Sequence, residues 1–421
     1  MCPHTFFKKM NTFFKKTALF WASIAPGIFL VGYNIGTGSI TTMASAGSEY
    51  GMTLTWALAL SCIFTYVLII AFSRYTMTTG QTTLHAFRQY FGSPITIFIL
   101  ISLIFSEITS SMGVMGVITE VVKEWSRPLT FNGEGFNTLV VGIIFAILLG
   151  YICWQGKQRF FENILFIFVF IMGISFLLTM FIVIPSPETI LSGLKPSIPN
   201  QTNALMIASG MVGTTMGAVL FVVRSTLVSE KGWTMSDMKI QKRDAFISVA
   251  MMFFLSFAIL ACAARAVYGE EITNAIQMVK LMEPLAGNLA TSIFVAGIVS
   301  AGLSSLFPIL LLAPWLISDY KGAKCNLKAP WVRLLIFAGL LCSLAVPVFG
   351  GRPVKIMIFS QTLCLIASPL VILFMAILLN RKKLMGKYIS TFWQNVIYGI
   401  IFLFTFVMTV VGVVGIKELL S

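Results

Sequence analysis

Long apolar runs, each of about twenty residues or more, constrain the fold of this chain more than any other feature. Because lipid offers the backbone no hydrogen-bond partners, only α-helices and closed β-barrels span a membrane. Barrel strands would be short and alternate between polar and apolar residues, whereas these runs are long and continuous. The pattern predicts an all-α polytopic membrane protein with about eleven transmembrane helices. The runs cover residues 20–45, 53–73, 95–117, 137–154, 161–184, 204–228, 245–267, 286–316, 331–349, 356–380 and 391–415.

The composition agrees with a membrane protein and excludes two other classes. Charged residues are 10% of the 421 residues and hydrophobic residues are 57%, whereas soluble domains average about 25% charged residues. A disordered chain would need low hydrophobicity and high charge. The net charge of +14 would suggest nucleic acid for a soluble protein. In a membrane protein it instead informs the orientation, and no nucleic-acid partner is predicted.

The basic residues of the loops lie mostly on one side of the predicted membrane. Twenty Lys and Arg residues fall in the loops on the side of the N-terminus and 8 on the other side. The positive-inside rule therefore predicts a cytoplasmic N-terminus and, after eleven helices, an external C-terminus, in a bacterial cytoplasmic membrane. Residues 1–19 repeat a Phe-Phe-Lys-Lys pattern and are expected to form a basic leader on the cytoplasmic surface, with Met10 as an alternative start.

Residues for enzyme chemistry are missing from the apolar runs. The two histidines, His4 and His85, both lie outside the runs, and the seven cysteines show no CxxC spacing. A Ser-His-Asp or Cys-His arrangement within the membrane is therefore excluded, and no HExxH zinc motif is present. We expect neither an enzyme nor a bound cofactor or resident metal ion.

Two runs are interrupted by small polar residues, at 32–42 in the first run and at 209–217 in the sixth. Glycine is costly inside a helix, and Ser, Thr and Asn compete for its hydrogen bonds. Interruptions at matching positions of two halves indicate a transporter site between inverted repeats. We predict a five-plus-five core with unwound helices 1 and 6, with repeats at about 20–184 and 204–380 and an added helix in 391–421. The alternative is close helix packing through small residues.

The interruptions give the candidate substrate-binding residues, with one amide added from the tenth run. They are Asn34, Gly36, Thr37, Gly38, Ser39, Gly213, Thr214, Thr215, Gly217 and Gln361.

Charges inside the membrane give the candidate coupling or gating residues, because each is costly to bury. Glu107 in the third run could carry a coupling proton, or it could form a structural pair with Arg224 or Arg333. Glu49, Glu162 and Asp244 lie near run ends, where solvated or capping roles are expected. The candidate coupling and gating residues are Glu107, Ser110, Arg224 and Arg333.

Six short segments, spread from the first run to the tenth, form a recognisable series. They are Ala25-Pro26-Gly27, Ala46-Gly47-Ser48-Glu49-Tyr50-Gly51, Arg159-Phe160-Phe161-Glu162, Ser225-Thr226-Leu227-Val228, Ser300-Ala301-Gly302-Leu303-Ser304-Ser305 and Ser360-Gln361. In their order and spacing they resemble the Nramp family of proton-coupled divalent-metal transporters, and the resemblance covers nearly the whole chain. It implies an eleven-helix inverted-repeat fold with unwound first and sixth helices.

The chain departs from the family at the positions that the resemblance implies for metal binding. The family's first-helix Asp-Pro-Gly-Asn falls on Gly36-Thr37-Gly38-Ser39, and its sixth-helix Met-Pro-His falls on Gly217-Ala218-Val219. A second histidine falls on Arg224, and the third-helix Asp-x-x-Glu falls on Glu107-x-x-Ser110. Met43 and Met216 remain as soft donors, although methionine in an apolar run usually serves packing.

These departures favour a transporter with an altered substrate. Helix N-termini at a break attract anions, Arg224 adds positive charge, and Gly36 and Gly217 leave a larger site. We therefore expect an organic anion, a metal chelate or a larger hydrated cation. The alternative is the family's own activity, with a divalent cation held by carbonyls and by Thr37, Ser39, Thr214, Thr215 and Gln361; Mg²⁺ then fits better than Mn²⁺ because it keeps several waters. A third hypothesis is a non-transporting membrane sensor.

Overall fold

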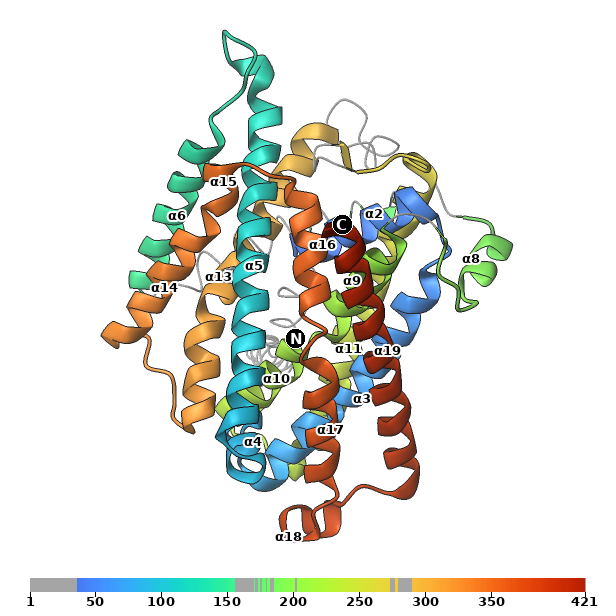
Figure 1. Cartoon of the computed structure of the whole chain (residues 1–421), viewed down its shortest axis with the longest axis vertical. Coiled ribbons are helices and arrows are strands. Elements are labelled where there is room, and N and C mark those ends of the chain that lie inside the picture. Colours follow the sequence, from blue (N-terminus) through green and yellow to red (C-terminus); the bar gives the residue numbers. More distant parts are fainter. Residues whose placement is uncertain are drawn as a thin grey trace, which may run out of the picture.

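The computed structural model describes residues 36–155, 185–200, 203–272 and 290–420, residues 277 and 278, and isolated positions between 170 and 181. Within these residues all regular secondary structure is helical (Figure 1). The predicted leader at 1–19, Asn34 and most of the first and fifth runs lie outside the described residues.

The helices of the first half follow the predicted runs. Helix α3 covers the second run, α5 exceeds the third run at both ends, and α6 covers the fourth. Their bounds are α2 (Thr37–Tyr50), α3 (Thr55–Thr79), α4 (Thr83–Phe91), α5 (Ser93–Ser126), α6 (Thr138–Gln155) and the short α8 (Pro187–Gly193).

The second half contains three runs that the structure divides into two helices each. These are the sixth, ninth and tenth runs. The bounds are α9 (Ala204–Met216), α10 (Ala218–Lys231), α11 (Met238–Ala266), α13 (Ala290–Lys321), α14 (Pro330–Ser343), α15 (Ala345–Phe349), α16 (Pro353–Leu363), α17 (Ser368–Leu379), α18 (Lys382–Met385) and α19 (Phe392–Leu420). Across the described residues, eight helical stretches are long and apolar enough to cross a membrane, and α6 is a shorter apolar helix.

Glycine ends two of the helices where the chain turns away. Gly80 follows α3 with φ of 71°, and Gly232 follows α10 with φ of 64°. Both values lie in the left-handed region, which other residues adopt at a cost. The Gly80 N–H donates to the carbonyl of Thr76 at 2.8 Å and so satisfies one carbonyl at the end of the helix.

The helix contacts are those expected of an inverted repeat, in which the first helix of each repeat packs against the second helix of the other repeat. Helix α2 packs along α11, while α9 and α10 pack along α3, so the first helix contacts the seventh and the sixth contacts the second. Helices α5 and α13, the third and the eighth, pack against each other (Figure 1). A methyl group on Gly47 would overlap the Leu260 carbonyl and lie 2.7 Å from the Ala263 Cβ. Gly47 therefore lets α2 and α11 approach closely.

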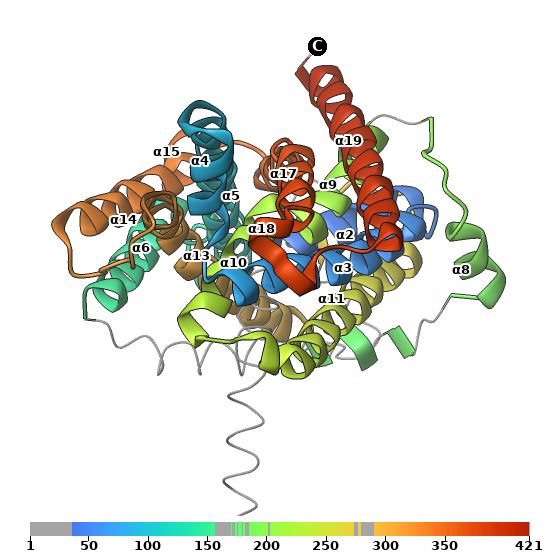
Figure 2. The same ribbon diagram turned by 90° about the horizontal axis from the view of Figure 1, so that it is seen from below.

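The sixth helix lies at the centre of the molecule. The apolar stretch of Ala204–Lys231 is 100% buried inside the protein, whereas that of α19 is only 28% buried. Figure 2 shows α6 and α14 on one flank and α19 on the other. A broken helix is tolerated at membrane depth only where protein or a water-filled cavity surrounds it. The central position of α9 and α10 meets this condition.

Helix α19 is attached to the core at both ends. At one end, the Arg74 guanidinium on α3 donates to Gln394 Oε1 at 2.7 Å, to Ser390 Oγ at 2.8 Å and to Tyr398 Oη at 3.2 Å. At the other end, a methyl group on Gly415 would lie 2.6 Å from the Met206 nitrogen of α9. The added helix is therefore packed directly against the repeat core.

Candidate functional site

The sixth helix is interrupted at one residue, Gly217. Helix α9 ends at Met216 and α10 begins at Ala218, and Gly217 between them has φ of −56° and ψ of 136°. The predicted interruption at 209–217 is therefore correct in place but too long, because 209–216 remain helical. One extended residue is enough to redirect the helix and to free backbone carbonyls at the end of α9.

The described part of the first helix begins beside this break. Gly36 has an extended backbone, and α2 starts at Thr37 with the Ile40 N–H donating to the Gly36 carbonyl at 3.1 Å. Of the predicted interruption at 32–42, residues 37–42 are helical, and residues 32–35 lie outside the described residues.

A further interruption beside this site, which we did not predict, divides the tenth run at residues 364–367. The Cys364 carbonyl accepts from the Ala218 N–H at 3.5 Å and from the Ser368 hydroxyl at 3.1 Å. The same hydroxyl donates to the Met216 carbonyl at 3.4 Å. The broken ends of the sixth and tenth helices thus satisfy each other's polar groups, which an apolar environment requires.

A small cavity lies where these helix ends meet. Its volume is about 30 Å³, room for one or two water molecules. Glu107 is the only charged side chain among the described residues that line it, and it is 3% exposed. The lining consists of Gly36, Gly38, Ser39, Glu107, Ser110, Val114, Gly213, Thr214, Gly217, Val219, Leu220, Ser305, Ile309, Met357, Gln361 and Cys364.

Most of the predicted site residues therefore line one cavity. Thr215 instead faces α3, where its hydroxyl donates to the Ser61 hydroxyl at 2.7 Å. Thr37 is buried, and its carbonyl accepts from the Thr41 hydroxyl at 2.8 Å, but its side chain does not line the cavity. The two predicted arginines also lie elsewhere, in the places described below.

The expectation that glycine leaves a larger site is wrong for Gly217, because neighbouring atoms already occupy the space beside it. A methyl group on Gly217 would lie 2.8 Å from the Gly213 carbonyl oxygen and 3.2 Å from the Cys364 Cβ. One on Gly38 would lie 2.5 Å from Gln361 Nε2 and 2.8 Å from the Met357 methyl, and one on Gly213 would overlap the Gln361 carbonyl. Residues of the tenth run therefore pack closely against all three glycines.

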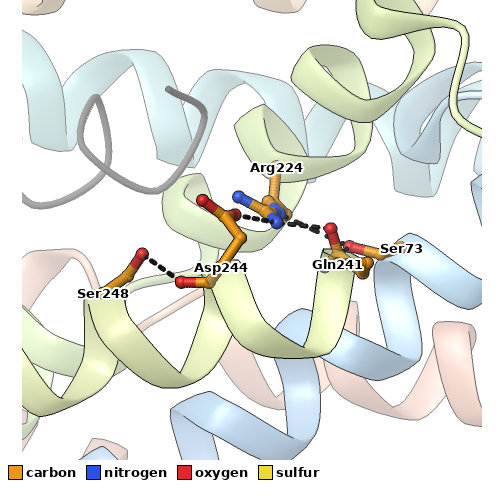
Figure 3. Close-up of polar contacts among 5 residues, drawn as sticks. All are labelled: Ser73, Arg224, Gln241, Asp244 and Ser248. Atoms are coloured by element: carbon orange, nitrogen blue, oxygen red, sulfur yellow. Dashed lines mark hydrogen bonds and ion pairs between the residues drawn. The ribbon is translucent and has the colours of Figure 1, made fainter. Parts of the chain in front are cut away.

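Arg224 is paired within the protein and does not line the cavity. Its guanidinium donates to the Asp244 carboxylate and to Gln241 Oε1, both on α11, while Gln241 Nε2 donates to the Ser73 hydroxyl at 2.6 Å (Figure 3). Arg224, Gln241 and Asp244 are each 0% exposed. Two predictions are corrected: Arg224 pairs with Asp244 and not with Glu107, and Asp244 is fully buried and neither solvated nor capping.

Arg333 likewise has a different partner from the one predicted. Its guanidinium carbon lies 3.9 Å from the centre of the Trp154 ring, so that α14 contacts α6 through a cation–π interaction. This contact is on the flank of the molecule, where the Trp154 side chain is exposed. Arg333 therefore contributes to helix packing and does not line the cavity.

Sequence reasoning missed the two sulfur-bearing residues of the lining. Met357 and Cys364 both face the cavity, as does Gln361, whereas Met43 and Met216 do not line it. The three residues of the tenth run are spaced by four and three positions, which places them on one face of a helix. This spacing, measured from the known candidate Gln361, was the signal available in the sequence.

A match to a family model shows the protein family to which this chain belongs. The model for natural resistance-associated macrophage protein-like proteins, Nramp, matches residues 27–415. The chain belongs to the Nramp family. The resemblance noted in separate segments therefore extends through the whole core, and membership in a family of transporters agrees with the prediction that the chain is not an enzyme.

Curated relatives in this family are distant in sequence and similar in length. A protein of Staphylococcus saprophyticus named divalent metal cation transporter MntH is 23% identical over 415 residues, covering 92% of this chain and 90% of the relative. A protein of the same name from Mesorhizobium japonicum is 24% identical over 387 residues, covering 87% and 83%.

Solved structures confirm the fold. A manganese transporter of Eremococcus coleocola, as a single-site mutant, matches with a TM-score of 0.76 and 14% identity, covering 95% of this chain and 87% of that chain. Mhp1, a nucleobase-cation-symport-1 family transporter, matches with a TM-score of 0.56 and 17% identity, covering 93% and 90%. The chain is therefore an integral membrane protein with the helical transporter fold that the sequence predicted.

Proposed function

We propose that this Nramp member is a secondary transporter that moves a metal cation through the cavity between α2, α9, α10 and α16. The observation that carries this proposal is the charge of the lining: Glu107 supplies a carboxylate, and no basic side chain stands among the described residues that line the cavity. A carboxylate with hydroxyl, amide and carbonyl oxygens around it suits a cation. In a cavity of low dielectric, that charge would repel an anion.

Two of the three arguments that favoured an organic anion lose their support in this structure. The charge of Arg224 is balanced by Asp244, and both side chains are fully buried between α10 and α11. The space beside Gly38, Gly213 and Gly217 is largely occupied by neighbouring atoms, most of them from the tenth run, and the remaining cavity has room for one or two waters. The N-terminus of α2 still favours negative charge, but the C-terminal carbonyls of α9 oppose it.

The relatives support a divalent cation as the first substrate to test. These relatives are named as divalent metal cation and manganese transporters, and we carry that substrate class to this chain as part of the proposal. The candidate residues for binding are those predicted residues that line the cavity, with Ser39, Thr214, Gln361 and Glu107 as oxygen donors.

We further propose that transport is coupled to a proton and that Glu107 is the group that carries it. A buried carboxylate in a membrane transporter is a functional candidate because its burial is costly. The proposed location is a bacterial cytoplasmic membrane with the N-terminus inside and the C-terminus outside. In the proposed domain division, residues 1–19 are a leader, 20–380 the repeat core and 391–421 the added helix.

Uptake into liposomes tests the proposal. Purified protein reconstituted with a metal-sensitive dye inside should show saturable Mn²⁺ or Mg²⁺ entry, and Glu107→Gln should reduce the initial rate by about tenfold or more, since it removes the only cavity charge we identify. Glu134→Gln is the matched control, because Glu134 lies exposed in the loop after α5. Full uptake by Glu107→Gln, or saturable uptake of an organic anion in place of a metal, would contradict the proposal.

A pH-sensitive dye in the same liposomes tests the coupling. Metal entry through the wild-type protein should acidify or alkalinise the interior in proportion to the metal moved. If Glu107→Gln still transports metal with the same proton movement as wild type, Glu107 is not the coupling group.

A further inference from the structure

Two sulfur-bearing residues of the tenth run line the central cavity. Met357 on α16 is 1% exposed and Cys364, directly after α16, is 6% exposed, and Gln361 lies between them in the lining. Both residues therefore border the same small space as Glu107.

The Met357 thioether is held in place by two glycines of other helices. A methyl group on Gly113 of α5 would lie 2.5 Å from the Met357 sulfur, and one on Gly38 of α2 would lie 2.8 Å from its terminal methyl. A larger residue at either position would displace the side chain. Close packing on two sides restricts the rotation that methionine otherwise has.

Cys364 lies at the break in the tenth helix. It is the residue that directly follows α16, and its Cβ would lie 3.2 Å from a methyl group on Gly217, at the break in the sixth helix. Cys364 is a free cysteine and lines the same cavity as Glu107. It is thus at the junction of two broken helices and borders the cavity that holds a carboxylate.

We propose that Met357 and Cys364 are sulfur ligands of a thiophilic metal cation, and that they shift the selectivity of this transporter from hard to soft ions. The inference rests on the proposed function as a cation transporter. Thiolate and thioether ligands select soft ions such as Cu(I), whereas oxygen ligands suit Mg²⁺ and Mn²⁺.

Binding by Cys364 requires loss of its proton. The S–H bond breaks, a bond between the thiolate sulfur and the metal forms, and the proton is released to water, with no change of oxidation state. The thiolate and the Glu107 carboxylate together neutralise a divalent ion, and the thiolate alone neutralises a monovalent one. The cavity volume of about 30 Å³ accommodates a largely dehydrated ion and excludes a chelate.

Equilibrium binding to the purified full-length protein tests the inference, with Cd²⁺ and Ag⁺ as redox-stable soft probes and Mn²⁺ as the hard comparison. We expect soft ions to bind more tightly than Mn²⁺, with thiolate-to-metal charge-transfer absorption on Cd²⁺ binding. Cys364→Ser should abolish the absorption and weaken Cd²⁺ and Ag⁺ binding by about tenfold or more. Met357→Leu, which keeps the thiol and a similar volume, should retain the absorption but weaken binding.

Matched controls separate a ligand role from a packing role. Cys262→Ser changes a thiol that is 0% exposed on α11, and Met43→Leu changes a methionine that is 0% exposed on α2; neither residue lines the cavity. Both should bind Cd²⁺ as wild type does. Wild-type Cd²⁺ affinity in both Cys364→Ser and Met357→Leu overturns the inference, as does absorption that persists in Cys364→Ser.

Uptake distinguishes this inference from the proposed function. Metal uptake that is the same for Mn²⁺ and Cd²⁺ and unaffected by Cys364→Ser leaves a cation transporter without a sulfur site. Tight, Cys364-dependent Cd²⁺ binding with no uptake of any cation retains the sulfur site and rejects the transporter.

Discussion

The Arg224 guanidinium on α10 and the Asp244 carboxylate on α11 form an ion pair in which both side chains are 0% exposed. Gln241 and Ser73 complete the network, so that α10, the second half of the sixth helix, is joined to the second and seventh helices (Figure 3). A buried charge without its partner is strongly unfavourable. The network therefore serves the packing of α10 and not the binding of substrate.

Breaking this pair should destabilise the protein. Asp244→Asn leaves the Arg224 charge buried without a counter-charge, and we expect a loss of about 3–5 kcal/mol. Replacing both residues together, with Arg224→Met and Asp244→Leu, should recover much of that loss, because no charge then remains. Thermal unfolding in detergent, followed by size-exclusion chromatography, measures both variants.

The exposed residue Lys383 on α18 provides the control for this prediction. Lys383→Met should unfold as wild type does. If Asp244→Asn were as stable as wild type, the pair would contribute nothing and our assignment of Arg224 to packing would be wrong.

Two glycines of α9 should respond in opposite ways to alanine. A methyl group on Gly213 overlaps the Gln361 carbonyl, whereas one on Gly210 has 3.4 Å to its nearest neighbour. Gly213→Ala should destabilise by about 1–3 kcal/mol through overpacking. Gly210→Ala should be neutral or stabilise by up to about 1 kcal/mol, because alanine favours the helix. Equal unfolding temperatures for the two variants would contradict the close approach of α16 to Gly213.

Removing the Arg74 side chain should loosen the start of α19. Arg74→Met deletes the donors to Gln394, Ser390 and Tyr398, and hydrogen bonds to a charged group are each worth about 1.5–3 kcal/mol. Hydrogen exchange followed by mass spectrometry should show faster exchange over residues 386–398. Exchange near the far end of the helix, where Gly415 packs on α9, should stay unchanged. Unchanged exchange at both ends would show that Arg74 does not anchor the helix.

The proposed orientation can be measured with fusions to the C-terminus. Alkaline phosphatase fused after Ser421 should be active in bacterial cells, because it folds only outside the cytoplasm, and green fluorescent protein at the same place should be dark. The same two reporters fused after Lys383, in a basic loop, should give the opposite result, because basic loops stay inside. Fluorescence from the C-terminal fusion would require an even number of spans or the inverse topology.

The break in the tenth helix shows how much local sequence could reveal. In the sixth run, clustered glycine and threonine predicted a break, and the backbone of Gly217 is extended. The tenth run carries only the weaker signal of Ser368 and Pro369, which begin α17. Its break depends on hydrogen bonds to Ala218 and Met216, which lie far away in the chain. A partner of that kind cannot be read from neighbouring residues.

The partners of the charged residues were likewise beyond the sequence. The sequence placed Glu107 and Arg224 inside apolar runs, and both are buried. The partner of Arg224, Asp244, lies on α11 near the start of the seventh run, where a solvated or capping role was expected. The partner of a buried charge depends on which helices pack together and on which residues lie at the same depth along them. A hydropathy profile gives neither piece of information.

By itself the sequence determined the helical membrane class, the places of most spans, the sixth-helix interruption and most of the residues that surround the cavity, because apolar length and glycine content act locally along the chain. Only the tertiary structure decided that the tenth run packs against the glycines, that Met357 and Cys364 line the cavity, and that Arg224 does not. These features depend on which side chains from helices far apart in the sequence occupy the same small volume. That arrangement is fixed only when the helices pack together.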